Sequence, residues 1–199
     1  ADNTELTNIT SVPGHNGEPA GAMDFNGVDS LATLPDENRL DLTGPFTIAF
    51  FIKGDAQTDH EWLIMTKHQA GVCQPADTSW MIRFQPGMGL RFVNYDTSVE
   101  CGKVILAAPE VNLLDDQWHH IAWVYDPAFD RLQLYVDGAL SEEALGNELN
   151  IENNSIPLIL GNQYQGVPQH ALDAALDEVY LYQIDLSPDQ VAILAAQGQ

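Results

Sequence analysis

The stretch WHHIAWVYDPAFDRLQLYVDG, residues 118–138, decides the fold class of this chain. In its second half, Leu132, Leu134 and Val136 occupy alternate positions and therefore share one face of an extended strand. An apolar run at 118–125 precedes them, and Asp137-Gly138 is a dipeptide that ends a strand in a tight turn. Two neighbouring strands with turn residues at their ends predict antiparallel β-structure.

Short apolar runs of this kind recur from residue 22 onward, separated by turn residues. The run at 46–53 is apolar on both faces, which predicts a central strand covered on both sides. Pro86-Gly87-Met88-Gly89 predicts a hairpin. This texture is typical of an all-β sandwich or barrel. The expected strands are 22–25, 29–34, 46–53, 61–66, 79–85, 89–95, 103–107, 118–125, 131–136, 157–160 and 176–183.

The C-terminal region predicts one short helix. Ser187 is a favourable N-cap, Pro188 suits the first helical position, and Asp189 suits the positive end of the helix dipole. A chain of 199 residues fits a single sandwich-sized domain, which we expect at 21–199. The polar residues 1–20 predict an N-terminal leader or linker that packs on this domain.

The chain is strongly acidic, with seven Lys and Arg against 29 Asp and Glu and a net charge of −22. Phosphate recognition needs clustered basic side chains, so nucleic acid is excluded as a partner, and an anionic membrane surface is repelled. No apolar run approaches the length of a membrane span, so we expect no membrane insertion. The charge indicates a solvating acidic coat, a few carboxylates that hold Ca²⁺, or both.

Two cysteines, Cys73 and Cys101, have no metal-ligand spacing and predict one disulfide, with two unrelated buried thiols as the alternative. A disulfide indicates an oxidising compartment, so we expect a secreted, extracellular or cell-surface protein. The chain opens at Ala1 without Met, which is typical of a processed product or of a monomeric module with neighbouring domains in a longer chain.

Several segments, in order, resemble the laminin-G-like family of concanavalin A-like sandwiches. The resemblance covers about residues 20–198 and is far more specific as an ordered set than in any one piece. It implies a jelly roll of two antiparallel sheets, one of them concave, with the first and last strands adjacent. The matching segments are AMDFNGVD at 22–29, LTGPFTI at 42–48, DQWHHIA at 116–122, LYVDG at 134–138, LDEVYLY at 176–182 and LSPDQV at 186–191.

The same resemblance implies a structural Ca²⁺ near the meeting of the first and last strands. Its ligands are the side chain of Asp177 and oxygens of Asn26, Gly27 and Asp29. Ca²⁺ takes six to eight oxygen ligands, which a turn beside a strand carboxylate can supply. The alternative is that Asp177 caps or pairs locally.

The segment between the cysteines carries the candidate ligand-binding residues. Sugar recognition combines an aromatic plane with fixed polar groups, and Arg83 and Arg91 flank the predicted hairpin, which brings them near one another. A carboxylated or hydroxyl-rich glycan is one partner for such a pair, and nearby Asp or Glu residues are the alternative. Trp62, Trp118 and Trp123 fall inside strand runs and are predicted to be core. The candidates in this segment are Trp80, Arg83, Arg91, Asn94, Tyr95 and Asp96, and Tyr164 in the polar, glycine-bounded loop at 161–166 is a further one.

Catalytic patterns are absent from the sequence, although this fold also houses glycoside hydrolases and polysaccharide lyases. Retaining hydrolysis needs two carboxylates on one face, whereas Asp177-Glu178 and Glu142-Glu143 are adjacent and so point to opposite faces of a strand. His119-His120 cannot share one ion for the same reason. No G-x-S-x-G motif occurs.

We therefore expect a non-catalytic binding module for a glycan or polysaccharide, part of a larger adhesin or carbohydrate-active protein. A protein-interaction or spacer domain without a sugar site is the first alternative. A polysaccharide lyase or glycoside hydrolase is the second.

Overall fold

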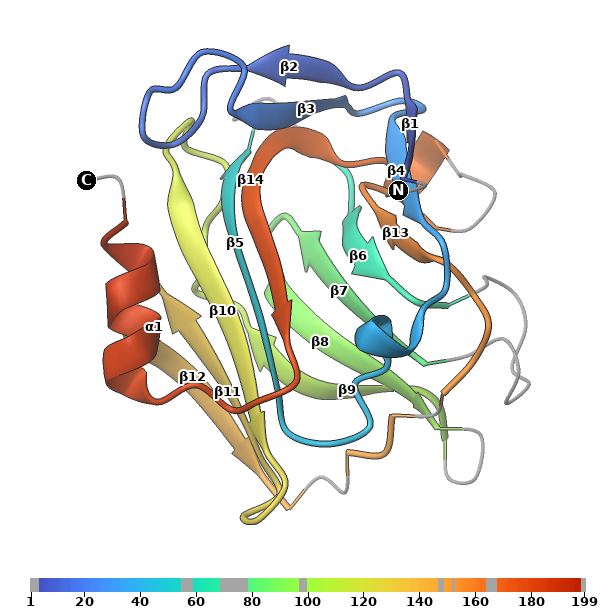
Figure 1. Cartoon of the computed structure of the whole chain (residues 1–199), viewed down its shortest axis with the longest axis vertical. Helices are drawn as coiled ribbons and strands as arrows, with labels where there is room; N and C mark the ends of the chain where they lie inside the picture. The colour runs from blue at the N-terminus through green and yellow to red at the C-terminus, as the bar shows by residue number, and fades with distance from the viewer. Residues whose placement is uncertain are drawn as a thin grey trace.

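Two antiparallel sheets of seven strands each face one another across the molecule (Figure 1). The computed structural model describes residues 4–54, 59–68, 79–96, 100–146, 149–151, 153–163 and 168–197. Sheet A consists, in spatial order, of β1 (Glu5–Thr7), β4 (Leu31–Leu34), β13 (Leu158–Leu160), β6 (Trp62–Thr66), β7 (Trp80–Gln85), β8 (Gly89–Asp96) and β9 (Glu100–Ala108). Sheet B consists of β12 (Ala139–Leu145), β11 (Arg131–Val136), β10 (His119–Asp126), β5 (Phe46–Gly54), β14 (Asp173–Tyr182), β3 (Ala22–Asn26) and β2 (Thr10–Val12).

The predicted sandwich is confirmed, and so is the adjacency of its first and last long strands. β3 pairs with β14, with Phe25 opposite Ala174. The predicted hairpin is also present, because Phe84 pairs with Leu90 and Gln85 with Gly89 on either side of its turn.

Three strands were not predicted: β1, β2 and β12. The first two have three residues each and the side chains of all three strands are mostly exposed, so an apolar pattern does not mark them. β1 pairs with β4 and β2 pairs with β3, so residues 4–20 contribute an edge strand to each sheet. The domain boundary at residue 20 stays a prediction.

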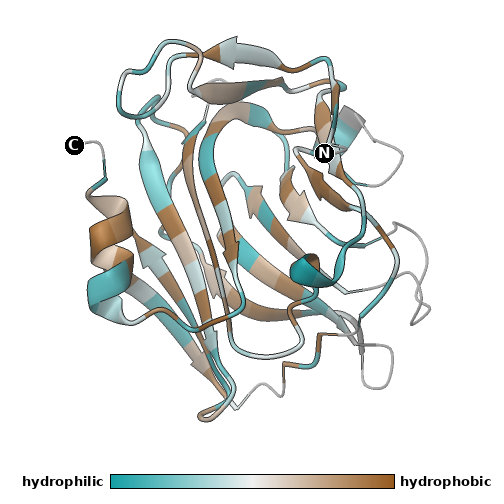
Figure 2. Cartoon of the chain, in the orientation of Figure 1, coloured by the Kyte–Doolittle hydropathy of each residue, from teal (hydrophilic) through white to brown (hydrophobic). Residues whose placement is uncertain are grey.

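The core lies between the sheets. Its largest fully buried side chains include Trp62, Trp80, Trp123 and Phe92. Hydrophobic and hydrophilic residues alternate along the strands, as Figure 2 shows, because successive side chains point to opposite faces. Each strand therefore has an inner face toward the core and an outer face away from it.

β5 is buried on both faces, as predicted for residues 46–53. On its outer face, Ala49 belongs to a second apolar cluster with Tyr135, Leu186 and Val191. The last of these lies in α1 (Pro188–Ala195), which packs over β10 and β12. The helix therefore covers one part of the outer face of sheet B.

The helix begins as predicted. The side chain of Ser187 accepts a hydrogen bond from the backbone N–H of Gln190, and the side chain of Gln190 accepts one from the backbone N–H of Ser187. This reciprocal capping fixes the start of the helix at Pro188. None of the helices in the described residues has the length and apolar character to cross a membrane.

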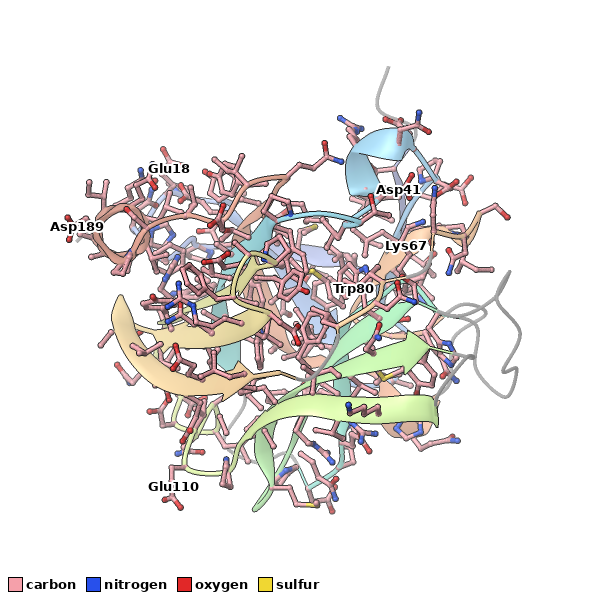
Figure 3. All side chains as sticks on the ribbon, turned by 90° about the horizontal axis from the view of Figure 1, so that it is seen from below. Glu18, Asp41, Lys67, Trp80, Glu110 and Asp189 are labelled. Carbon is pink, nitrogen blue, oxygen red and sulfur yellow. The ribbon has the colours of Figure 1, made fainter. Side chains whose placement is uncertain are left out.

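A buried lysine joins three segments at the far end of β6. Lys67 is 1% exposed, and its ammonium lies 2.6 Å from Oδ1 of Asp36. It also donates to the backbone carbonyls of Asn154, at 3.0 Å, and Ile156, at 3.2 Å. Figure 3 shows Lys67 beside Asp41, whose carboxylate is 3.5 Å away. A buried charge needs such compensation, so this contact holds the loop around η1 (Asn38–Leu40) against the sheet.

Candidate ligand-binding site

A row of residues crosses the outer face of sheet B where β3, β14 and β5 meet. Asp24 on β3 is opposite Ala175 on β14, and Ala175 is opposite Lys53 on β5. Their chain neighbours Phe25, Leu176 and Ile52 belong to the core, so the three side chains of the row point outward.

A hollow of about 440 Å³ opens over this row. Ala175 forms its base, because its methyl group stands between two longer side chains. Neighbouring strands are about 4.8 Å apart, so the backbones that carry Asp24 and Lys53 are separated by roughly 10 Å. Besides the row, the hollow is lined by Val12, Pro13, Gly14, Phe25, Asn26, Gly54, Asp116, Trp118, Asp173 and Ala174.

Trp118 extends the row on the side of β10. His119 pairs with Ile52, so Trp118 comes next to Lys53 in the register. The tryptophan is half-buried and lines the hollow, which corrects its prediction as a core residue. Its position has the same parity as the outward-facing Ala122, whereas Trp123 has the opposite parity and is fully buried. The period-two alternation of the strand therefore places Trp118 on the outer face, and this signal was missed in the sequence.

The lining of the hollow is polar and mainly acidic. It contains the carboxylates of Asp24, Asp116 and Asp173, the amide of Asn26 and one ammonium, that of Lys53. Oδ2 of Asp24 accepts a hydrogen bond from the hydroxyl of Thr10 at 3.3 Å. Carboxylates accept and an ammonium donates, so this set suits a ligand rich in hydroxyl groups, which do both.

The loop between β2 and β3 forms one wall of the hollow and is held down by His15. The backbone N–H of His15 donates to Oδ2 of Asp177 at 2.9 Å, and the ring Nδ1 lies 2.8 Å from the same oxygen. The ring stacks on Phe51 with a centroid separation of 3.7 Å, and its Nε2 lies 2.8 Å from the carbonyl of Gln197. Burial disfavours the imidazolium, but the hydrogen bonds to Asp177 and Gln197 outweigh it and raise the pKa of His15.

Gly14 is required for this arrangement. A Cβ atom at this position would lie 2.6 Å from Oδ2 of Asp177 and 3.3 Å from Cα of Gly21. The loop therefore approaches β14 as closely as only glycine permits.

The adjacent histidines face opposite sides, as predicted. His120 is 3% exposed, and its burial lowers its pKa to about 4, so it is neutral at pH 7. The ring of His119 lies 2.9 Å from Asp137 and 3.2 Å from Asp115. Burial opposes protonation of His119, but the two carboxylates raise its pKa.

The four residues proposed as Ca²⁺ ligands lie in two separate places. Asn26 pairs with Asp173, and Asp177 is four residues further along β14, roughly 13 Å away. The carboxylate of Asp177 accepts the backbone N–H groups of His15 and Glu178, so both of its oxygens have hydrogen-bond donors.

The polar groups of the turn at residues 26–29 likewise form hydrogen bonds with one another. Oδ1 of Asn26 accepts the backbone N–H groups of Val28, Asp29 and Ser30. The amide of Asn26 donates to Asp29, and the N–H of Gly27 donates to the carbonyl of Leu172. Within the described ranges, no three His, Cys, Asp or Glu side chains are grouped closely enough to hold a metal ion. These residues do not fit one Ca²⁺ site, and the presence of Ca²⁺ stays a prediction.

The arginine pair predicted from the sequence lies on the outer face of sheet A. Arg83 is directly opposite Arg91, as expected from the hairpin. The two guanidinium groups share one carboxylate, since Oε1 of Glu61 lies 3.1 Å from Arg83 and 3.6 Å from Arg91. Arg91 also donates to Oε1 of Gln85 at 2.7 Å. Burial and the neighbouring Arg83 lower the pKa of Arg91. The arginines therefore have a protein carboxylate, which was the alternative interpretation.

The other candidate residues do not form one open site. Trp80 is 0% exposed and packs on Phe92 in the core, so a stacking role for Trp80 is wrong. Figure 3 shows Trp80 inside the molecule. Asn94 is 2% exposed and donates to the carbonyl of Asn150. Tyr95 is half-buried and its ring stacks on His68 at 3.9 Å.

The remaining candidates lie at the limits of the described residues. Asp96 ends β8, and its side chain is outside the described set. Tyr164 and Cys73 also lie outside it, as does the side chain of Cys101 on β9. The disulfide stays a prediction.

Comparison with known sequences fixes the family of the chain. The sequence model of the concanavalin A-like lectin/glucanases superfamily matches residues 26–192. The chain belongs to the concanavalin A-like lectin/glucanase superfamily. The match begins at Asn26, the last residue of β3, and extends into α1, so it includes Lys53 and Ala175 of the row but not Asp24. No curated protein sequence matches the chain.

Solved structures share the concanavalin A-like architecture at low sequence identity. The binding domain of Paraclostridial mosquitocidal protein 1 aligns with a TM-score of 0.74 and 19% identity, over 98% of this chain and 47% of that one. The ligand-binding domain of botulinum neurotoxin serotype D, in complex with N-acetylneuraminic acid, aligns with a TM-score of 0.73 and 11% identity, over 98% of this chain and 45% of that one. The chain thus spans about half the length of each, and these likenesses show the fold alone.

Proposed function

We propose that the protein is a non-catalytic, glycan-binding module of a larger secreted or cell-surface protein. The observation that carries the proposal is the partly exposed Trp118 at one end of a polar row with a hollow over its centre. An aromatic plane covers the apolar face of a sugar ring, and fixed polar groups orient its hydroxyls.

The shape of the hollow supports an elongated ligand. From the start of β10 to β3, the row crosses three strand spacings, about 14 Å. Trp118 stands at one end and Asp24 at the other, with Lys53 between them. A row of this length accommodates more than one sugar ring, so we propose an oligosaccharide or polysaccharide rather than a monosaccharide.

The comparisons support a binding role at a coarse level. The superfamily includes lectins, and the similar structures are binding domains of larger proteins, one of them with a bound sialic acid. Extracellular location and the Cys73–Cys101 disulfide belong to the same proposal and rest on the sequence.

A glycan array followed by calorimetric titration tests the proposal. We expect reproducible binding to hydroxyl-rich glycans and a loss of about 10- to 100-fold in affinity for Trp118→Ala, as for other central aromatic contacts. Phe129→Ala is the matched control, because Phe129 is 69% exposed in the β10–β11 turn, at the opposite end of β10 from Trp118.

Two outcomes would contradict the proposal. If no glycan binds, the domain is a protein-interaction or spacer module. If bound alginate, laminarin or agar gains reducing ends during incubation, the module is an enzyme, and the carboxylates of the hollow are then the first residues to replace.

A further inference from the structure

A second cavity lies between the two sheets, on the opposite face of β3 and β14 from the hollow. Its volume is about 290 Å³, and residues of both sheets line it. Leu34 on β4 and Leu158 on β13 form one wall, and Val179 and Leu181 on β14 form the other. The cavity is therefore an apolar opening in the side of the sandwich.

An unpaired strand edge borders this cavity. β3 pairs with β14 only as far as Leu176, and β5 pairs with the other side of β14 through Tyr182. Within the described part of the chain, Tyr180, Leu181 and Tyr182 thus have a strand partner on one side only, and Glu178 and Val179, where the register shifts, have no strand partner. The backbone groups of such an edge are a template for another strand.

Glu178 marks the point where the edge becomes unpaired. The register of β14 against β5 shifts between Asp177 and Tyr180, which makes Glu178 part of a β-bulge, and its φ of 45° is uncommon for a residue other than glycine. Oε2 of Glu178 is buried, and the Glu178 carboxylate interacts with the hydroxyl of the neighbouring Tyr180, whose pKa is raised by burial and by this carboxylate. Backbone strain of the kind that this positive φ represents concentrates at binding sites.

We propose that this edge binds an extended peptide as an added strand of sheet B. Alternate side chains of such a peptide point to one face, so an apolar residue enters the cavity while its neighbours remain outside. A basic side chain of the peptide pairs with the carboxylate of Glu178, which borders the cavity. The net charge of −22 favours a basic partner over an acidic one. The partner is therefore a segment in which apolar and basic residues alternate.

A labelled peptide of alternating Lys and Val residues, followed by fluorescence anisotropy, tests this proposal. Because an acidic protein attracts any basic peptide, backbone pairing must be separated from charge. Two further peptides serve this purpose, one N-methylated at every Val and one at every Lys. An added strand pairs through alternate residues, so one of the two should bind at least about 10-fold more weakly than the parent peptide.

Glu178→Gln should weaken binding of the parent peptide by about 3- to 10-fold, and Phe129→Ala should leave it unchanged. Hydrogen exchange gives a second readout, in which the bound peptide slows exchange of backbone amides at 178–182. The proposal is overturned if both N-methylated peptides bind as tightly as the parent, or if residues 178–182 gain no protection. Glycan binding does not enter these measurements, so their failure leaves the glycan site untouched.

Discussion

The outer faces of the two sheets differ in how their polar residues are used. On sheet A, Arg83 and Arg91 share Glu61, and the apolar residues beside them are closed off from solvent, with Val93 only 1% exposed. On sheet B, Lys53 and Asp24 stand on either side of an alanine, and a hollow opens above it. The two arginines of sheet A are thus engaged by a protein carboxylate, whereas on sheet B a small residue between two polar ones leaves space above it and marks the candidate site.

The largest expected effect separates the two tryptophans. Trp80→Ala should lower the free energy of unfolding by about 3–5 kcal/mol, because it leaves a cavity in the core. Trp118→Ala should cost less, because Trp118 is partly exposed and lines the open hollow, so its truncation leaves no closed cavity. Urea denaturation measures both. Equal losses would mean that Trp118 is a core residue, as first predicted.

Replacing Glu61 tests whether the arginine face is a compensated cluster. Glu61→Gln should lower the free energy of unfolding by about 1–3 kcal/mol, since it leaves two neighbouring guanidinium groups without their carboxylate. Gln85→Ala is the matched control and should cost less, because it removes a neutral acceptor. If Glu61→Gln is neutral while glycan affinity changes, the arginine face is the ligand site instead.

The His15–Asp177 contact predicts a pH dependence for the wall of the hollow. The pKa of His15 is raised in the folded state, so its protonated ring stabilises the protein fully below the unfolded pKa of about 6.5 and progressively less as the pH rises through the folded value. His15→Gln should therefore cost about 1.5–3 kcal/mol at pH 5.5 and less at pH 8.5.

Comparing this variant with the wild type at each pH removes the contributions of other groups. His120 acts in the opposite direction, because its depressed pKa makes acid destabilising. A cost for His15→Gln that is independent of pH, or that grows as the pH rises, would show that the ring is neutral in the contact.

The smallest expected effect is that of a chelator. Because Asp177 is already bonded to His15 and the turn at residues 26–29 to its own backbone, EDTA should shift the melting temperature by less than about 1 °C. A larger fall that added Ca²⁺ reverses would support the calcium prediction and place its ligands in another arrangement.

The sequence was sufficient for the architecture because period-two patterns and turn residues act locally. It identified β10, β11 and the start of α1, and it placed Arg83 beside Arg91 through the hairpin. The site depends on register between distant strands. Nothing local places Asp24, Ala175 and Lys53 in one row, since β3, β14 and β5 are brought together only by the fold.

Contacts between residues far apart in the sequence could not be predicted either, because only the fold brings such residues together. His15 and Asp177 are 162 residues apart, and their contact decides both the wall of the hollow and the failure of the transferred Ca²⁺ ligand set. The position of Trp118 was predictable in principle, because it has the parity of the outward residues of β10.

The central claim is that the hollow over Ala175 holds the glycan, and filling it is the most direct test. Ala175→Leu adds an apolar side chain on the outer face, at the base of the hollow, and leaves the core unchanged. Calorimetric titration with a glycan bound by the wild type should show at least about a 10-fold loss of affinity, with the melting temperature within a few degrees of the wild type. Unchanged affinity in a folded Ala175→Leu protein would contradict the account and place the glycan elsewhere.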